Sequence, residues 1–164
     1  GTFEAGTGLY PRPGDLCAFV YVFDRNQQLL ECCGCVITPN GLREFDINND
    51  LTDNSLTGGT IEEGVIKVVS HPKNGPAPKV RGIFDDLDCN PASITNPQAT
   101  LRSWGIHLND DAEEQNEVAA TETESLEAPL SQSELRRLQG RCRFIITNAS
   151  GSGLCSCGEG GIDP

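Results

Sequence analysis

The stretch Cys17-Ala-Phe-Val-Tyr-Val-Phe23 is apolar at nearly every position, with aromatic residues from Phe19 onward at odd positions and Ala or Val at even ones. In an extended chain successive side chains point to opposite faces, so both faces of this segment are apolar. A strand of this kind is stable where other elements cover both of its faces. We therefore expect residues 17–23 to form a central strand of a sheet.

Short apolar segments separated by turn residues continue on either side of this strand. The residues 24–26 precede a second predicted strand at 28–37, and Thr38-Pro-Asn-Gly41 is a strong turn signal before a third at 42–47. Further strands are predicted at 60–70, 79–84, 101–108 and 142–147, followed by a short last strand that carries Cys155 and Cys157. In 101–108 we expect Trp104, Ile106 and Leu108 to face the core, with Trp104 as an anchor.

Helical signals are confined to one segment near the C-terminus. Ser131-Gln-Ser-Glu134 is a capping box, and it predicts a short helix over 134–139 that ends at Gly140. The acidic, Thr-rich segment before it, at 117–126, is expected to be a loop or an exposed edge strand. The pattern predicts an all-β fold, an antiparallel β-sandwich of immunoglobulin-like type in preference to a jelly roll, with one short helix. Residues 15–164 are expected to form a single domain, preceded by an N-terminal extension at 1–14.

Eight cysteines in 164 residues indicate an oxidising environment. The even number, together with a chain that begins at Gly1 and contains no Met, leads us to expect a processed, secreted protein with every cysteine in a disulfide. The cluster at 32–35 is expected to pair with distant cysteines, although the sequence does not decide the connectivity. A metal–thiolate or iron–sulfur site is the less favoured alternative, because C-x-C is not the usual zinc spacing. The cysteines in question are Cys17, Cys32, Cys33, Cys35, Cys89, Cys142, Cys155 and Cys157.

Charge and motifs narrow the classes of function. The net charge of −12 argues against nucleic acid as a partner, and no apolar run is long enough for membrane insertion. Asp46-Ile-Asn-Asn-Asp50 begins like a calcium loop but lacks the required Gly and Glu, so an ordinary Asn/Asp turn is favoured. Neither His71 nor His107 has an evident catalytic neighbour, so we expect no enzymatic activity, no cofactor and no metal. Asn148-Ala-Ser150 matches the N-glycosylation acceptor.

Several segments together resemble uncharacterised, secreted, Cys-rich bacterial proteins. The resemblance rests on Glu31-Cys-Cys-Gly-Cys35, on Thr38-Pro-Asn-Gly-Leu42 and on the ending Gly151-Ser-Gly-Leu-Cys-Ser-Cys157. It spans most of the chain and implies an exported, disulfide-rich protein that is extracellular or at the cell surface. It implies no activity and no catalytic residues.

The N-terminal extension supplies the functional hypothesis. Over residues 2–10, apolar and small side chains alternate with Glu and Gly, which gives an extended chain one largely apolar face. Such an extension resembles the donor strands of pilus subunits, which complete a neighbour's immunoglobulin-like sheet. We therefore expect a structural protein that forms a linear or helical homopolymer by strand donation. The expected interface residues are Phe3, Ala5, Thr7, Leu9 and Tyr10.

Two other readings of the chain stay open. One is a monomeric secreted module for surface binding or adhesion, with carbohydrate as a possible ligand. The other is a secreted metal–thiolate or redox protein. The N-terminal strand itself has a second reading, because it can pair within its own subunit instead of with a neighbour.

Overall fold

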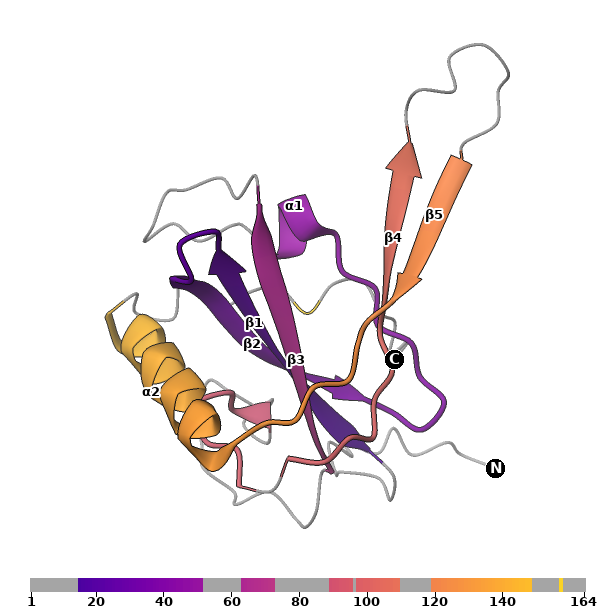
Figure 1. The fold of residues 1–164 in the computed structure, drawn as a ribbon. Helices are drawn as coiled ribbons and strands as arrows, with labels where there is room; N and C mark the ends of the chain where they lie inside the picture. The colour runs from indigo at the N-terminus through magenta and orange to yellow at the C-terminus, as the bar shows by residue number, and fades with distance from the viewer. Residues whose placement is uncertain are drawn as a thin grey trace, which may run out of the picture.

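The computed structural model describes residues 15–51, 63–72, 89–95, 97–109, 119–148 and 157. A three-stranded sheet lies against a long C-terminal helix, and a two-stranded hairpin projects from this body (Figure 1). In chain order the elements are β1 (Leu16–Asp24), β2 (Leu29–Ile37), α1 (Ile47–Asp50), β3 (Gly64–Pro72), β4 (Trp104–Asn109), β5 (Ala119–Glu124) and α2 (Gln132–Asn148).

Strand β1 is the centre of the fold. The sheet order is β2-β1-β3, and β1 is antiparallel to both neighbours. Every residue of β1 from 17 to 22 is buried, as the doubly apolar sequence predicted. The predictions of a central strand and of an antiparallel second strand are confirmed.

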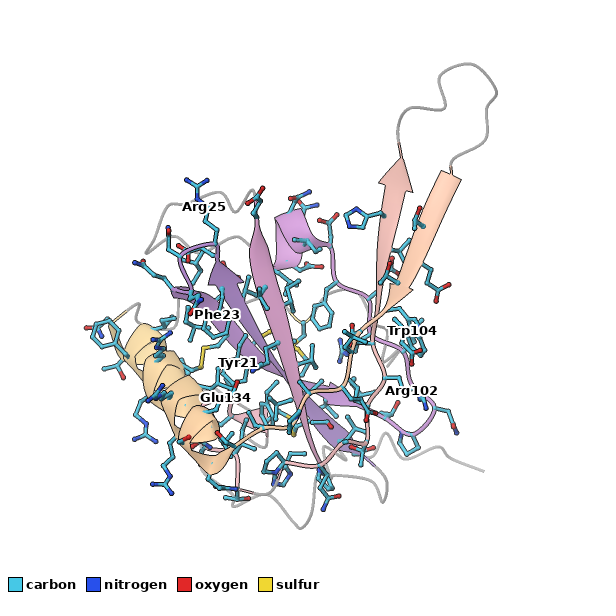
Figure 2. The ribbon with its side chains drawn as sticks, in the orientation of Figure 1. Tyr21, Phe23, Arg25, Arg102, Trp104 and Glu134 are labelled. Atoms are coloured by element: carbon cyan, nitrogen blue, oxygen red, sulfur yellow. A yellow bond between two sulfur atoms is a disulfide. The ribbon has the colours of Figure 1, made fainter. Side chains whose placement is uncertain are left out.

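The two faces of the sheet are covered by different parts of the chain. Tyr21 and Phe23 lie between the sheet and α2 (Figure 2), in a core that also receives residues from the segment 89–95. On the opposite face, Val20 and Val22 pack with Leu51 and Phe45 from the segment around α1. A helix on one face and an irregular segment on the other therefore cover the apolar side chains of the central strand. Within the described residues no second sheet packs against it, so the predicted sandwich is not shown.

Helix α2 is much longer than the sequence predicted. It runs from Gln132 to Asn148, and the predicted strand at 142–147 is wrong because these residues form its last turns. Cys142 and Ile145 follow Leu135 and Leu138 at helical spacing, and all four are buried against the sheet. Gly140, which was predicted to end the helix, lies inside it at an exposed position.

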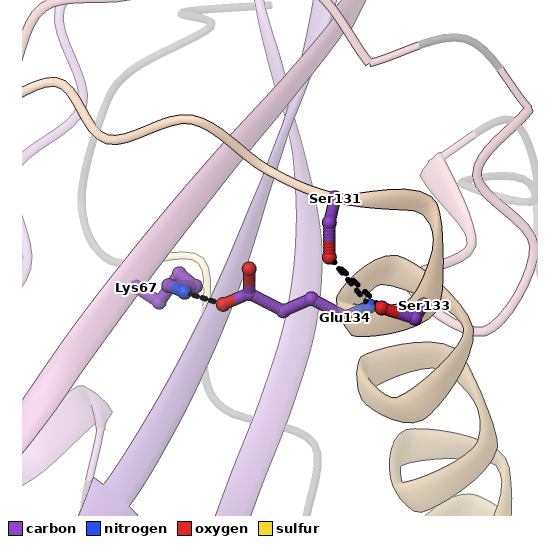
Figure 3. Close-up of polar contacts among 4 residues, drawn as sticks. All are labelled: Lys67, Ser131, Ser133 and Glu134. Atoms are coloured by element: carbon purple, nitrogen blue, oxygen red, sulfur yellow. Dashed lines mark hydrogen bonds and ion pairs between the residues drawn. The ribbon is translucent and has the colours of Figure 1, made fainter.

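The N-terminus of α2 has half of the predicted capping box. The Ser131 hydroxyl accepts a hydrogen bond from the Glu134 N–H at 3.2 Å, as an N-cap does. The Glu134 side chain turns instead to the Lys67 ammonium on β3 (Figure 3). This carboxylate therefore joins the helix to the sheet.

The predicted third strand at 42–47 is wrong. Pro39 and Asn40 form the expected turn, with the Gly41 N–H donating to Thr38 O at 2.8 Å and Asn40 at φ 60°. After it the chain crosses the face of the sheet opposite α2 instead of pairing with β2. The outer edge of β2 accepts a side chain there, because Arg43 Nε donates to Val36 O at 3.1 Å.

The remaining strand predictions meet the structure in different ways. The predicted strand at 60–70 corresponds to β3, that at 101–108 to β4, and the expected edge strand at 117–126 to β5. Strands β4 and β5 pair antiparallel with each other, Trp104 opposite Glu124. The predicted strand at 79–84 and the N-terminal extension at 1–14 lie outside the described residues.

Candidate functional site

The cysteine-rich segment of β2 is a structural staple. Cys32 is bonded to Cys142 of α2 and Cys35 to Cys157, while Cys17 of β1 is bonded to Cys89. Cys33 is disulfide-bonded as well. Alternation along the strand sends Cys32 to the α2 face and Cys33 and Cys35 to the other, so the sheet is stapled to both covering layers.

These disulfides occupy the sulfur atoms that a metal–thiolate site would need. No described cysteine is free, and the described part of the chain holds no cluster of metal-ligating side chains. The disulfides of Cys32 and Cys35 span 110 and 122 residues, so these two cysteines of the 32–35 cluster pair with distant cysteines, as predicted. Such bonds indicate an oxidising environment, as outside the cell. No helix in the described ranges has both the length and the apolar character to cross a bilayer.

The Asp46 segment, considered above as an incomplete calcium loop, is the N-cap of α1. One carboxylate oxygen of Asp46 accepts from the N–H groups of Asn48 and Asn49, at 2.8 and 3.1 Å. These backbone hydrogen bonds, that of Asn49 foremost, lower the pKa of Asp46. The carboxylate is thus used within its own turn, as in an ordinary Asx turn.

The titratable side chains do not form a catalytic group among the described residues. His71 Nε2 lies 3.0 Å from Thr95 Oγ1, while His107 is exposed on β4. The Tyr21 hydroxyl donates to Pro91 O at 2.7 Å, and burial raises the pKa of this phenol far above its ordinary value. Its role is to fix the segment 89–95 against the sheet.

The outer edge of β3 is a candidate surface for backbone pairing. The Ser70 carbonyl accepts from the Gln98 N–H at 2.8 Å, which shows that the backbone of Ser70 points away from β1. In an antiparallel strand every second residue has the same orientation, so Gly64, Ile66 and Val68 also direct N–H and C=O outward. No described segment hydrogen-bonds to these three residues.

The opposite edge of the sheet is engaged near the C-terminal end of β2. On β2, Arg43 contacts the outward carbonyl of Val36, and the same guanidinium donates to Cys157 O at 3.3 Å. Cys157 Sγ lies 3.7 Å from Gly34 O. The N-terminal part of β3 is an edge of the sheet to which no described segment hydrogen-bonds, and the sequence contained no signal for it beyond the strand itself.

The hairpin β4–β5 carries an exposed apolar face. Trp104 is 47% exposed and Ile106 63% exposed, so the expectation that they face the core is wrong. Their cross-strand partners are Glu124 and Glu122. The Arg102 guanidinium binds Glu124 at 2.8 Å, whereas Glu122 has no described partner. Leu108, expected on the same face, has a side chain outside the described set.

A shallow hollow of about 460 Å³ lies between α2 and the β1–β2 turn. Arg141 Nη1 donates to Gln27 O at 3.1 Å across it, and the exposed ring of Phe144 forms part of its wall. The Asp24 carboxylate shapes the turn by accepting from the N–H groups of Asn26 and Gln28 at 2.9 and 2.8 Å.

The structure describes the possible glycosylation site but not the expected interface residues. The expected interface residues Phe3, Ala5, Thr7, Leu9 and Tyr10 all lie outside the described residues. Asn148, the possible glycosylation site, is exposed at the end of α2 and donates through Nδ2 to Phe144 O at 2.7 Å. The exposed apolar residues of the hairpin and of α2 were not expected as sites.

Comparison with protein families, with curated proteins and with solved structures finds no match for this chain. Function is therefore argued from the surfaces described above.

Proposed function

We propose that this protein is a non-enzymatic extracellular structural protein whose copies assemble into a fibre by strand donation. Residues 2–10 of one copy add to the outer edge of β3 in the next. The observation that carries the proposal is the outer edge at Gly64, Ile66 and Val68, to which no described segment hydrogen-bonds. Backbone pairing supplies affinity in such additions, and side-chain contacts supply register.

The edge has few of the features that prevent strand addition. Natural edge strands are protected by outward charges, bulges or Pro, whereas the single Lys of β3 is bound to Glu134 and Pro72 stands at its far end. Val65 and Ile66 are 61% and 41% exposed beside the open backbone groups. An added strand with an apolar face would cover these side chains.

The charge of the chain is compatible with this mode of contact. At a net charge of −12, copies repel each other, so assembly needs apolar burial or backbone pairing. The disulfides support an oxidising, extracellular location.

Deletion of residues 1–10 tests the donor. The truncated protein should retain its far-ultraviolet circular dichroism and lose fibres in electron microscopy and analytical ultracentrifugation. Fibres from the truncated protein would contradict strand donation, as would a full-length protein that stays monomeric at high concentration. If truncation unfolds the chain, adding a peptide of residues 2–10 should restore the fold.

A second pair of variants tests the acceptor edge. Ile66→Lys places a charge on the open edge and should raise the concentration needed for assembly about tenfold or more, since burial of an Ile contributes roughly 1.5–3 kcal/mol. Ile47→Lys is the matched control, because Ile47 on α1 is 50% exposed. Equal effects of the two variants would exclude the β3 edge as the acceptor.

One observation favours a second candidate, a monomeric surface-binding module. Trp104 is an exposed aromatic residue on a projecting hairpin, and such rings stack on the apolar faces of sugars. This alternative expects binding on a glycan panel that Trp104→Ala abolishes, with no dependence on residues 1–10.

A further inference from the structure

The hairpin β4–β5 exposes apolar side chains that the described body of the protein does not cover. A two-stranded hairpin alone is marginally stable in water, and the described part of the chain places no other element against it. Figure 1 shows it extending away from the sheet, on the side opposite α2. Its face nevertheless presents Trp104 and Ile106, two of the residue types whose burial drives protein association.

We propose that this hairpin docks into the hollow beside α2 of a second copy of the same chain. The inference rests on the proposed self-assembly and adds to it a second contact, separate from the donated strand. Trp104 and Ile106 would cover Phe144, which is 67% exposed at the hollow. Glu122 would lie near the arginines of α2.

Charge complementarity indicates that the hollow beside α2 receives the hairpin of a second copy. The chain is strongly acidic, yet α2 carries four arginines against one glutamate, and that glutamate is bound to Lys67. Arg137, Arg141 and Phe144 follow each other at helical spacing and so share one flank of α2, and of these three Arg141 and Phe144 line the hollow. The hairpin strands carry Glu122 and Glu124, the latter bound to Arg102, together with His107 and no Lys or Arg. A hairpin face with Trp104 and Ile106 opposite two glutamates thus matches a flank of α2 that carries the exposed Phe144 ring and guanidinium groups.

The positions of the two surfaces determine the kind of assembly. Because hairpin and hollow are different patches on opposite sides of the molecule, their contact is heterologous and leaves a free patch of each kind on every pair. Such a contact repeats from copy to copy. It is therefore compatible with the head-to-tail order of copies in a fibre that strand donation holds together.

Photo-crosslinking in the full-length protein tests this contact. Benzoylphenylalanine in place of Phe144, with isotope-labelled and unlabelled copies mixed, should give crosslinks between copies that map to β4 or β5. The matched control carries the crosslinker at Leu42, which is 78% exposed and is not among the residues that line the hollow. That control should give no crosslinks to the hairpin.

Charge reversal adds a readout that tests specificity. Glu122→Lys should lower the crosslink yield about three- to tenfold, as should Arg137→Glu, because each replaces an attraction by a repulsion. Mixing Glu122→Lys copies with copies that carry Arg137→Glu and the crosslinker should restore the yield. Failure of this rescue, while each single variant remains folded by circular dichroism, would overturn the pairing.

The outcomes separate this inference from the proposed function. Fibres without hairpin crosslinks would refute the hairpin contact and leave strand donation intact. Hairpin crosslinks in a protein that never forms fibres would support the contact and refute the fibre. A protein that stays monomeric without crosslinks, or one whose hairpin binds glycans instead, would refute the contact.

Discussion

The substitution Gly34→Ala tests how β2 is covered on the α2 face. Gly34 lies opposite Phe19 of β1, and a Cβ added to it would stand 1.8 Å from the carbonyl oxygen of Cys89. Ordinary van der Waals contact begins near 3.4 Å, so the Cys89 backbone would have to move by more than 1 Å. It is held there by the disulfide to Cys17. Relief by a local shift is therefore restricted.

Overpacking of this kind lowers the free energy of unfolding by roughly 1–3 kcal/mol. With a urea slope of roughly 1–3 kcal/mol per molar, the midpoint should fall by about 1 M. Far-ultraviolet circular dichroism is the appropriate probe, since Trp104 stands on the exposed hairpin and reports poorly on the core.

Gly140→Ala is the matched control, because it makes the same chemical change. An added Cβ at Gly140 meets no atom within 4 Å, and the residue lies inside α2. Ala in a helix interior is favoured over Gly by about 1 kcal/mol, so this variant should be more stable than the parent. The reasoning is refuted if Gly34→Ala unfolds at the parent's midpoint or above it, since the segment around Cys89 would then not lie against β2.

Three further expectations concern local interactions. Gln27 has φ 61°, a conformation that glycine adopts more easily than other residues, so Gln27→Gly should raise the free energy of unfolding by about 0.5–1 kcal/mol in urea titration. A lower free energy of unfolding would argue against this loop conformation. Glu134→Gln should lower the free energy of unfolding by less than about 1 kcal/mol, since the side chains of Lys67 and Glu134 are 32% and 37% exposed. This loss should become smaller in high salt. An equal loss of stability in high salt would contradict an ionic origin. Backbone N–H groups lower the pKa of Asp46, so its carboxylate stabilises the fold at any pH above the ordinary Asp pKa. This contribution disappears as the pH falls through the lowered pKa of the folded state. Carbon-13 NMR titration should find a lower pKa for Asp46 in the folded protein than in the unfolded one.

The sequence alone was sufficient where a pattern has one structural solution. Residues 17–23 are apolar with a period of two on both faces, and a strand covered on both sides is what such a pattern requires. Ser131 was recognisable as an N-cap because the hydroxyl and the N–H it serves are three residues apart. The cysteine density likewise predicted oxidised sulfur, which depends on redox environment and not on fold.

Tertiary contacts decided the features that these local patterns leave open. Residues 142–147 contain enough β-branched and apolar side chains for a strand, yet they continue α2 because Cys142 and Ile145 then share the buried face with Leu135 and Leu138. The disulfide to Cys32 of β2 holds that face against the sheet.

The candidate surfaces depended on the tertiary structure most of all. Alternation in β4 correctly placed Trp104 and Ile106 on one face, but whether a face is covered depends on the other elements that reach it, and none of those described does. The edge of β3 to which no described segment hydrogen-bonds is equally non-local, because it follows from the order β2-β1-β3 of the described strands. A strand's own residues determine its periodicity; its neighbours in space determine which edges and faces stay free to bind.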